Sequence, residues 1–227
     1  MRPPPTLSGY TVAMWLLLLT CAADLPPTPV APFDPIPAAT GPRVVFLGDS
    51  LTAAYGLPES DGFPARVAVL LAAEGLPVDV VNAGVSGDTS AGGLRRVDWI
   101  LKQEPDVVVL ALGANDMLRG LPPAECAANL RAIVDRARAA GADVLLLGMK
   151  ANPTLGPDYV AAFDEIYPTL AAETGVPLVP FILEGVAGDA LLNQSDGIHP
   201  TVQGHQQLAT LVLPALTPLV RARSAAR

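Results

Sequence analysis

The sequence predicts an α/β fold in which helices cover both faces of a parallel sheet. Short, mostly apolar segments recur along the chain after residue 43, and runs with apolar residues at helical spacing separate them. Strands that are apolar throughout are buried on both faces, and their alternation with helices indicates parallel pairing. The expected strands are Val44–Leu47, Val78–Val81, Val107–Leu112, Val144–Leu147 and Pro177–Phe181.

The intervening helices follow from apolar residues three and four positions apart. Asp88 and Thr89 are suited to cap the second helix, Gly75 with Pro77 ends the first, and Gly141 ends the third. The expected helices lie at 63–71, 94–101, 130–137, 160–170 and 201–212, and Pro214 kinks or ends the last one.

The first 42 residues are expected to lie outside this domain. Residues 1–23 resemble an export signal, because Arg2 precedes an uncharged, mostly apolar run from Tyr10 to Ala23 that is too short to span a bilayer. Residues 24–42 contain seven prolines, which predicts an extended tether. A single domain is expected at 43–227.

Two routes of processing fit the export signal. Cleavage near Ala22 or Ala23 would release a soluble protein. Alternatively, Leu18-Leu19-Thr20-Cys21 resembles a lipoprotein box with Cys21 as the lipidated residue, although Thr20 departs from the Gly, Ala or Ser that is usual there. Both routes predict an exported, periplasmic protein, either soluble or anchored through Cys21.

The composition excludes several functional classes. A formal net charge of -8 argues against nucleic acid as a partner, because phosphate binding needs clustered Lys and Arg, and it provides no basic patch for anionic lipid. Hydrophobic residues at 51% and charged residues at 16% indicate a globular chain. The two cysteines, Cys21 and Cys126, exclude a disulfide framework, and Cys126 is expected in the core.

Glycine-rich and polar motifs follow the first three strands and the fifth. Ligands bind beyond the carboxyl ends of the strands in parallel sheets, so these motifs are expected to meet there. They are Gly48-Asp49-Ser50-Leu51, Asn82-Ala83-Gly84-Val85-Ser86-Gly87-Asp88, Gly113-Ala114-Asn115-Asp116 and Asp196-Gly197-Ile198-His199-Pro200.

The side chains in these motifs are those that acyl transfer from a serine requires. Ser50 is a candidate nucleophile and His199 its base, since imidazole titrates near neutrality. Asp196, three residues earlier, is placed to hold the Nδ1 proton of that imidazole. The backbone N–H groups of Ser50 and Gly84 and the amide of Asn115 are the expected oxyanion donors.

Each motif also has a purely structural interpretation. Ser50 and Asn115 are common types of helix cap, Gly84 could serve only a turn, and Asp196 with His199 could form a capped turn. The four blocks each follow a predicted strand, in one order along the chain, and this conjunction favours catalysis over the separate structural interpretations.

That order of blocks is similar to the order in the SGNH, or GDSL, hydrolase family. Ser50, Gly84, Asn115 and His199 match the four residues that name the family, and Asp196 matches the acid of its Asp-x-x-His block. The resemblance covers the chain from about residue 43 to the last helix.

One branch of that family is especially similar, the exported bacterial enzymes described as arylesterase, acyl-CoA thioesterase and lysophospholipase. Residues 48–56 and parts of 149–178 carry this resemblance. It implies a three-layer α/β/α sandwich with a five-stranded parallel sheet, and no metal or organic cofactor. Asp49 and Asp116 belong to the motifs and are interpreted as residues that fix turns.

We therefore expect a monomeric serine esterase that cleaves acyl esters and thioesters of small molecules. The alternatives are a carbohydrate O-acetylesterase on the same scaffold and a non-catalytic acyl or lipid carrier. A metal site at His199 and His205 would lack a third ligand, and residues 84–93 lack the Gly-Lys-Ser/Thr ending of a phosphate loop. The apolar residues expected to line the acyl site are Met117, Leu118, Leu121, Pro153 and Leu155.

Overall fold

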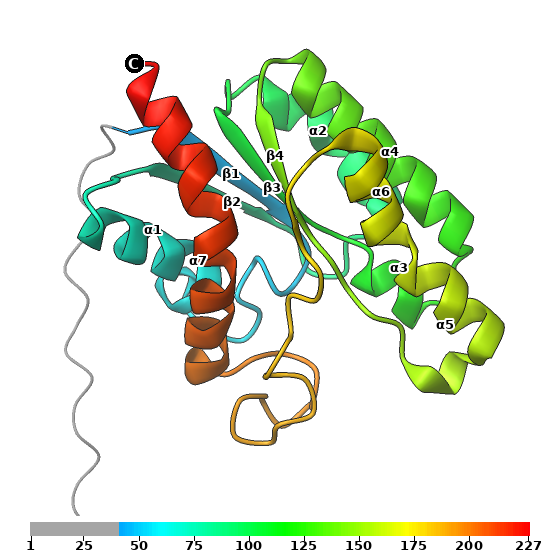
Figure 1. Ribbon diagram of the computed structural model, residues 1–227. Helices are drawn as coiled ribbons and strands as arrows, with labels where there is room; N and C mark the ends of the chain where they lie inside the picture. Colours follow the sequence, from blue (N-terminus) through cyan, green and yellow to red (C-terminus); the bar gives the residue numbers. More distant parts are fainter. Residues whose placement is uncertain (1–40) are drawn as a thin grey trace, which may run out of the picture. The chain divides into compact units, whose positions relative to one another are not determined.

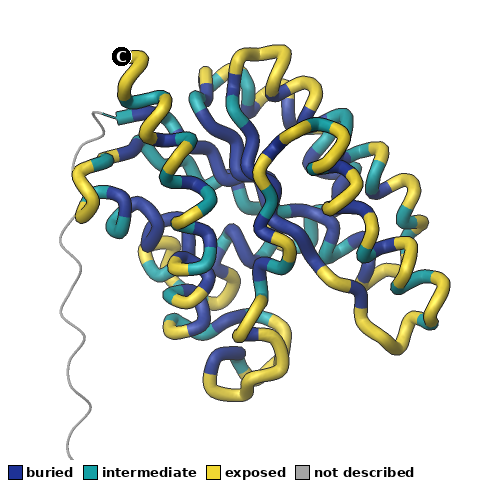
Figure 2. The backbone as a smooth tube through the Cα atoms, viewed as in Figure 1, coloured by how far each residue is buried: buried dark blue, intermediate teal, exposed yellow. Residues whose placement is uncertain are grey.

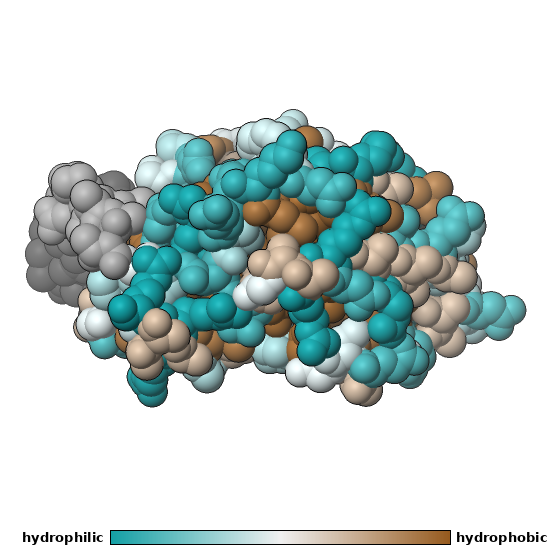
Figure 3. Space-filling model, turned by 90° about the horizontal axis from the view of Figure 1, so that it is seen from above, coloured by the Kyte–Doolittle hydropathy of each residue, from teal (hydrophilic) through white to brown (hydrophobic). Residues whose placement is uncertain are grey.

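A computed structural model describes residues 41–227. The predicted export signal, the cysteine of the predicted lipoprotein box and residues 24–40 of the predicted tether lie outside the described residues. Among residues 41–227, no helix has both the length and the apolar character that crossing a bilayer requires. The face of the molecule in Figure 3 is largely hydrophilic, with hydrophobic residues gathered near its middle.

The described chain is built on one sheet of five parallel strands, in the order β2-β1-β3-β4-β5. This confirms the predicted sheet and the number of its strands. The strands are β1 (Arg43–Gly48), β2 (Asp79–Gly84), β3 (Val107–Ala111), β4 (Asp143–Leu147) and β5 (Leu178–Val179).

Helices form a layer on each face of the sheet, as the α/β/α prediction requires (Figure 1). The helices α1 (Phe63–Ala73) and α7 (Val202–Ala225) pack together on one face. The other layer contains α2 (Ser90–Leu101), α4 (Pro123–Ala139) and α6 (Ile166–Thr174). The shorter elements are η1 (Glu59–Asp61), α3 (Ala114–Leu118), η2 (Pro153–Leu155) and α5 (Pro157–Asp164).

The core lies along the central strands, which Figure 2 shows buried between the two helical layers. Val44, Val45, Phe46 and Leu47 of β1 are completely inaccessible to solvent. Strands with both faces covered must be apolar at consecutive positions rather than at alternate ones. The unbroken apolar run of β1 is therefore what a strand in the interior of the sheet requires.

Proline explains one helix boundary that the apolar pattern alone did not predict. The predicted helix over 160–170 is divided into α5 and α6 at Glu165. Pro168 lacks an N–H, and its ring clashes with the carbonyl of Asp164, four residues earlier, in a continuous helix. Pro214 and Pro218 act differently, since α7 continues through both of them. The last helix is thus not ended by Pro214.

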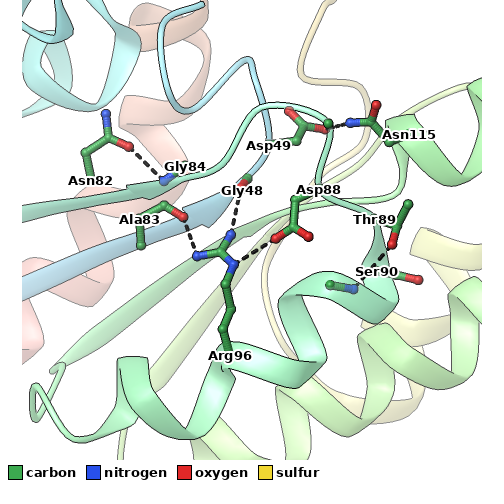
Figure 4. Close-up of polar contacts among 12 residues, drawn as sticks. Gly48, Asp49, Asn82, Ala83, Gly84, Asp88, Thr89, Ser90, Arg96 and Asn115 are labelled. Carbon is green, nitrogen blue, oxygen red and sulfur yellow. Dashed lines mark hydrogen bonds and ion pairs between the residues drawn. The ribbon is translucent and has the colours of Figure 1, made fainter.

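Arg96 of α2 ties together the carboxyl ends of β1 and β2 (Figure 4). Its Nη1 donates to the carbonyl of Ala83 at 2.7 Å and its Nη2 to the carbonyl of Gly48 at 2.9 Å. Its Nε lies 2.7 Å from Oδ2 of Asp88. Asp88 therefore anchors Arg96, whereas Thr89 alone caps α2 by accepting from the N–H of Gly92.

Replacing Arg96 by Leu should lower the free energy of unfolding by about 2–4 kcal/mol, because it leaves the largely buried carboxylate of Asp88 without its cationic partner and removes one donor from each of two carbonyls. Chemical denaturation measures this change. Arg131→Leu is the matched control, since Arg131 pairs on the surface with Glu173 and its loss should cost about 0–1 kcal/mol. Equal costs for the two variants would contradict this role of Arg96.

Candidate active site

Ser50 lies in a tight turn directly after the central strand β1. Oδ1 of Asp49 accepts the N–H of Leu51 at 3.0 Å, and the carbonyls of Asp49 and Ser50 accept from Ala53 and Tyr55. These bonds fix the turn, as predicted for Asp49. Within residues 41–227 no protein acceptor takes the Ser50 N–H, so this donor remains available.

His199 and Asp196 lie where the sequence predicted them, beside the serine. Nε2 of His199 is 2.9 Å from Oγ of Ser50, and its Nδ1 is 2.7 Å from Oδ2 of Asp196. Oδ1 of Asp196 accepts the N–H groups of Ile198 and His199, each at 3.0 Å. The Nδ1–H group of the neutral imidazole donates a hydrogen bond to the carboxylate. Its Nε2 is then free to accept the proton of the serine hydroxyl.

The hydrogen bond from His199 is the main cause that lowers the pKa of Asp196 to about 2, and the two backbone N–H groups add to it. The carboxylate is consequently ionised throughout the range in which imidazole titrates. A full negative charge beside Nδ1 stabilises the imidazolium that forms when Nε2 takes a proton.

The loop that carries both residues is closed by hydrogen bonds of its own. Asn193 and Pro200 form an antiparallel bridge, and the N–H of Gln194 donates to the carbonyl of His199 at 2.7 Å. The side-chain amide of Gln194 also donates to the carbonyl of Tyr55 at 2.8 Å, which joins this loop to the serine turn. Gly197 has a φ of 75°, a backbone conformation that favours glycine.

The ring of Tyr55 covers the imidazole of His199, with a centroid separation of 4.5 Å and an interplanar angle of 35°. No catalytic motif in the sequence signalled this contact. The sequence shows only that Tyr55 belongs to residues 48–56, which carry the resemblance to one branch of the family.

Asn115 lies in the short helix α3, which follows β3 through Gly113. Its Nδ2 lies 3.4 Å from Oδ2 of Asp49, so its amide faces the serine turn (Figure 4). Residues 114–118 are helical. Asp116, the next residue, accepts from the N–H and the hydroxyl of Ser90 and so anchors the start of α2.

Burial raises the pKa of Asp49 to about 6 from an ordinary value of 3.8. The residue is 2% exposed, and the Leu51 N–H, the nearby His199 and the Asn115 amide together offset only part of the effect of burial. A buried carboxylate without a cationic partner is costly to the fold.

The structure contradicts the prediction that the Gly84 N–H is an oxyanion donor. The N–H groups of Asp79 and Val85 donate to the β1 side, so the Gly84 N–H points to the free edge of β2. There it donates to Oδ1 of Asn82 at 3.0 Å, away from Asn115 in Figure 4. Gly84 is required for another reason, since a Cβ there would lie 2.3 Å from the backbone N of Ala53.

Gly87 lies in the turn after β2, within the motif of residues 82–88, and its backbone N–H is free to bind an oxyanion. Its φ is 81°, and within the described part of the chain no protein acceptor takes its N–H. Arg119, at the end of α3, donates to the Gly87 carbonyl and links this turn to the Asn115 helix. The sequence has two glycines in Gly84-Val85-Ser86-Gly87, and either could supply the backbone donor. Choosing between them requires the position at which β2 ends, which the sequence does not give to within one residue.

A pocket of about 540 Å³ opens beside Ser50 and His199. This is a usual size for a small-molecule site. Its apolar part includes Met117, Leu118, Met149, Ala151, Pro153, Phe181, Leu183 and Ile198, and its polar part includes Asp49, Asn115, Lys150, Asn152 and Asn193.

Three of the five residues predicted to line the acyl site do contact this pocket, namely Met117, Leu118 and Pro153. Leu121 and Leu155 do not line it. Leu121 lies beyond the end of α3, where its carbonyl accepts from the hydroxyl of Tyr159. The sequence pattern did not indicate Phe181, Leu183 or Ile198, because their contribution depends on how the chain after β5 returns to the serine.

The remaining candidate groups lie in the core. Burial raises the pKa of the Cys126 thiol to about 12, and Cys126 is a core residue as predicted. His205 is buried, burial lowers its pKa to about 4, and its Nδ1 accepts the N–H of Phe63. Among residues 41–227 no three His, Cys, Asp or Glu side chains are grouped so that they could hold a metal ion.

Comparison with known proteins gives the family. A sequence profile of the GDSL-like Lipase/Acylhydrolase family matches residues 46–207. The chain belongs to this family. The predicted family is therefore confirmed, and the five-stranded sheet agrees with it.

Two curated relatives and one crystal structure are similar over most of their length. Esterase TesA of Pseudomonas aeruginosa is 46% identical over 80% of this chain and 91% of that protein. Thioesterase 1/protease 1/lysophospholipase L1 of Escherichia coli is 40% identical over 81% of this chain and 87% of that protein. A crystal structure of TesA is similar with a TM-score of 0.75 and 47% identity, covering 78% of this chain and 99% of that one.

Replacing Asp49 by Asn should stabilise the protein increasingly as the pH rises from about 4 to 7. The pKa of about 6 in the folded chain exceeds the ordinary 3.8, so the folded state binds more protons in this window and loses stability as pH rises through it. The difference of roughly 2 pKa units corresponds to about 3 kcal/mol. Thermal unfolding at several pH values measures it, and a difference in Tm that does not change with pH would contradict it.

Proposed function

We propose that this member of the GDSL family is a serine esterase that hydrolyses acyl esters and thioesters through Ser50, His199 and Asp196. The single observation that carries the proposal is the continuous hydrogen-bond chain from Oγ of Ser50 through both nitrogens of His199 to Asp196. Family membership supports the reaction class, and the names of the relatives support the choice of ester and thioester substrates.

In the first step, Oγ of Ser50 attacks the acyl carbonyl while Nε2 of His199 takes the hydroxyl proton. The protonated imidazole then gives that proton to the leaving alcohol or thiol, which departs and leaves an acyl-serine. In the second step, water attacks the acyl-serine, Nε2 accepts the proton of the water, and the carboxylic acid is released as Ser50 recovers its proton. Asp196 keeps the imidazole oriented throughout.

The developing oxyanion needs donors that are free in the resting site. The Ser50 N–H and the second hydrogen of the Asn115 amide meet this requirement, and we assign the third position to the Gly87 N–H in place of Gly84. Two observations support this assignment. The Gly87 N–H has no protein acceptor within the described residues, whereas the Gly84 N–H already donates to Oδ1 of Asn82.

The pocket supports an acyl chain longer than acetyl. Apolar side chains make up much of its lining, and each methylene that they bury gains about 0.8 kcal/mol, or roughly fourfold in kcat/KM while room remains. Export to the periplasm, the mode of processing at Ala22 or Cys21 and the monomeric state stay predictions, because they rest on the sequence alone.

Replacing Ser50 by Ala should lower kcat by about 10⁴-fold or more on a p-nitrophenyl ester, because only binding and the oxyanion donors remain. A phosphonate ester probe should label the wild type at Ser50, located by peptide mass mapping, and leave the variant unlabelled. Labelling at another serine would overturn the assignment. Binding of acyl esters without turnover by the wild type would instead indicate the carrier.

Replacing Leu118 by Asp should flatten the preference for medium acyl chains while sparing acetate. Leu118 lines the pocket, and a carboxylate there would remove apolar surface on which the gain from a longer acyl chain depends. The measurement is kcat/KM across p-nitrophenyl esters of increasing length. Leu155→Asp is the matched control, because Leu155 is an apolar residue partly exposed outside the pocket. If acetate is the best substrate of the wild type, the carbohydrate O-acetylesterase replaces this proposal.

A further inference from the structure

A buried carboxylate beside the nucleophile takes no part in the reaction described above. Asp49 precedes Ser50, is among the residues that line the pocket, and is 2% exposed. Its contacts within the described chain are two donors, the Leu51 N–H at 3.0 Å and Nδ2 of Asn115 at 3.4 Å. Asp49 forms no ion pair with a Lys or Arg in that part of the chain. The turn alone does not require a carboxylate, because one oxygen accepts the Leu51 N–H.

The second oxygen, Oδ2, faces the amide of Asn115. An ionised carboxylate can only accept hydrogen bonds, whereas an amide can present either its NH₂ or its oxygen to a neighbour. Oδ2 therefore selects the NH₂ side. One amide hydrogen is used by Asp49, and the other is left for an acceptor in the pocket.

We propose that Asp49 is a positioning residue that holds the Asn115 amide with its N–H directed at the oxyanion. The inference rests on the proposed function, since it concerns how one oxyanion donor is oriented. Asp49 touches neither substrate nor the reacting atoms in this account. It acts only through Asn115, and it does so because it is ionised and lacks a donor of its own.

Asp49→Asn separates the two contacts of the carboxylate without changing its shape. The backbone N–H of Leu51 requires an acceptor, so the oxygen of the new amide must remain on that side. Its NH₂ then faces Asn115, which turns its own oxygen inward to accept and directs its NH₂ away from the oxyanion. The expected result is a fall in kcat of about tenfold or more with KM little changed, which is typical of a donor used in the transition state.

The decisive experiment is a double-mutant cycle with Asn115→Ala. If Asp49 acts through Asn115, Asp49→Asn lowers kcat by less than about twofold in the Asn115→Ala background. Equal losses in both backgrounds would overturn the proposal. Asp49→Ser, whose hydroxyl can still accept the Leu51 N–H, should show the same coupling and covers the case in which the Asn variant does not fold.

Asp116→Asn is the matched control. Asp116 is also buried, directly follows Asn115, and accepts hydrogen bonds from Ser90 rather than from the Asn115 amide. Its effect on kcat should be the same in both backgrounds. Coupling as strong as that of Asp49 would show that the cycle detects general loosening of the site, and would overturn the proposal.

The pH profile of kcat is a second readout. A protonated Asp49 can donate to the Asn115 oxygen and release the amide from its orientation, so the acid limb should be steeper in the wild type than in Asp49→Asn. The groups that act on Asp49 are the Leu51 N–H, the Asn115 amide, His199 and Asp88. Identical acid limbs in the two proteins would count against the proposal. A wild type without esterase turnover would refute the proposed function itself, and this outcome is distinct from the others.

Discussion

The parallel register of β1, β2 and β3 determines where the chemistry lies. Gly48 of β1 pairs with Gly84 of β2 on one side and with Ala111 of β3 on the other. Three chain segments far apart in the sequence therefore leave the sheet at the same level, and each turns into a polar loop there. The serine turn, the Gly87 turn and the Asn115 helix are neighbours because of this alignment, and Arg96 ties two of the strand ends together.

The strand segments, their parallel pairing and the residues proposed for the Ser-His-Asp chain were predictable from the sequence. Burial on both faces leaves a continuous apolar signal, and polar motifs follow four of the strands. The direction of a single N–H was not predictable. Whether Gly84 faces β1 or the free edge depends on which residues of β2 bond to its neighbour, and a shift of one residue reverses it. The sequence also did not show which apolar residues after the strands contact the pocket. Leu118 lines it, whereas Leu121 and Leu155 do not.

Whether a proline ends a helix was also not predictable from the sequence. Pro168 divides two helices, whereas Pro214 and Pro218 are accommodated within α7. Each proline removes a helical hydrogen bond and crowds the carbonyl four residues earlier. Whether the helix continues depends on the packing around it. Val212, Leu216 and Val220 of α7 are fully buried, so continuing this helix past the prolines buries apolar surface that would otherwise be exposed.

The base and its acid come from one closed loop only a few residues long, while the nucleophile comes from the far end of the domain sequence. Asp196 accepts hydrogen bonds from both the backbone N–H and the imidazole of His199, so the two residues would move together if the loop were displaced. The separation between the two is therefore insulated from such a movement. The distance between Nε2 of His199 and the serine hydroxyl has no such constraint within the loop, so it depends on contacts between the loop and the serine turn such as the hydrogen bond from Gln194 to Tyr55. Loss of these contacts would interrupt proton transfer while the acid–base pair itself stayed assembled.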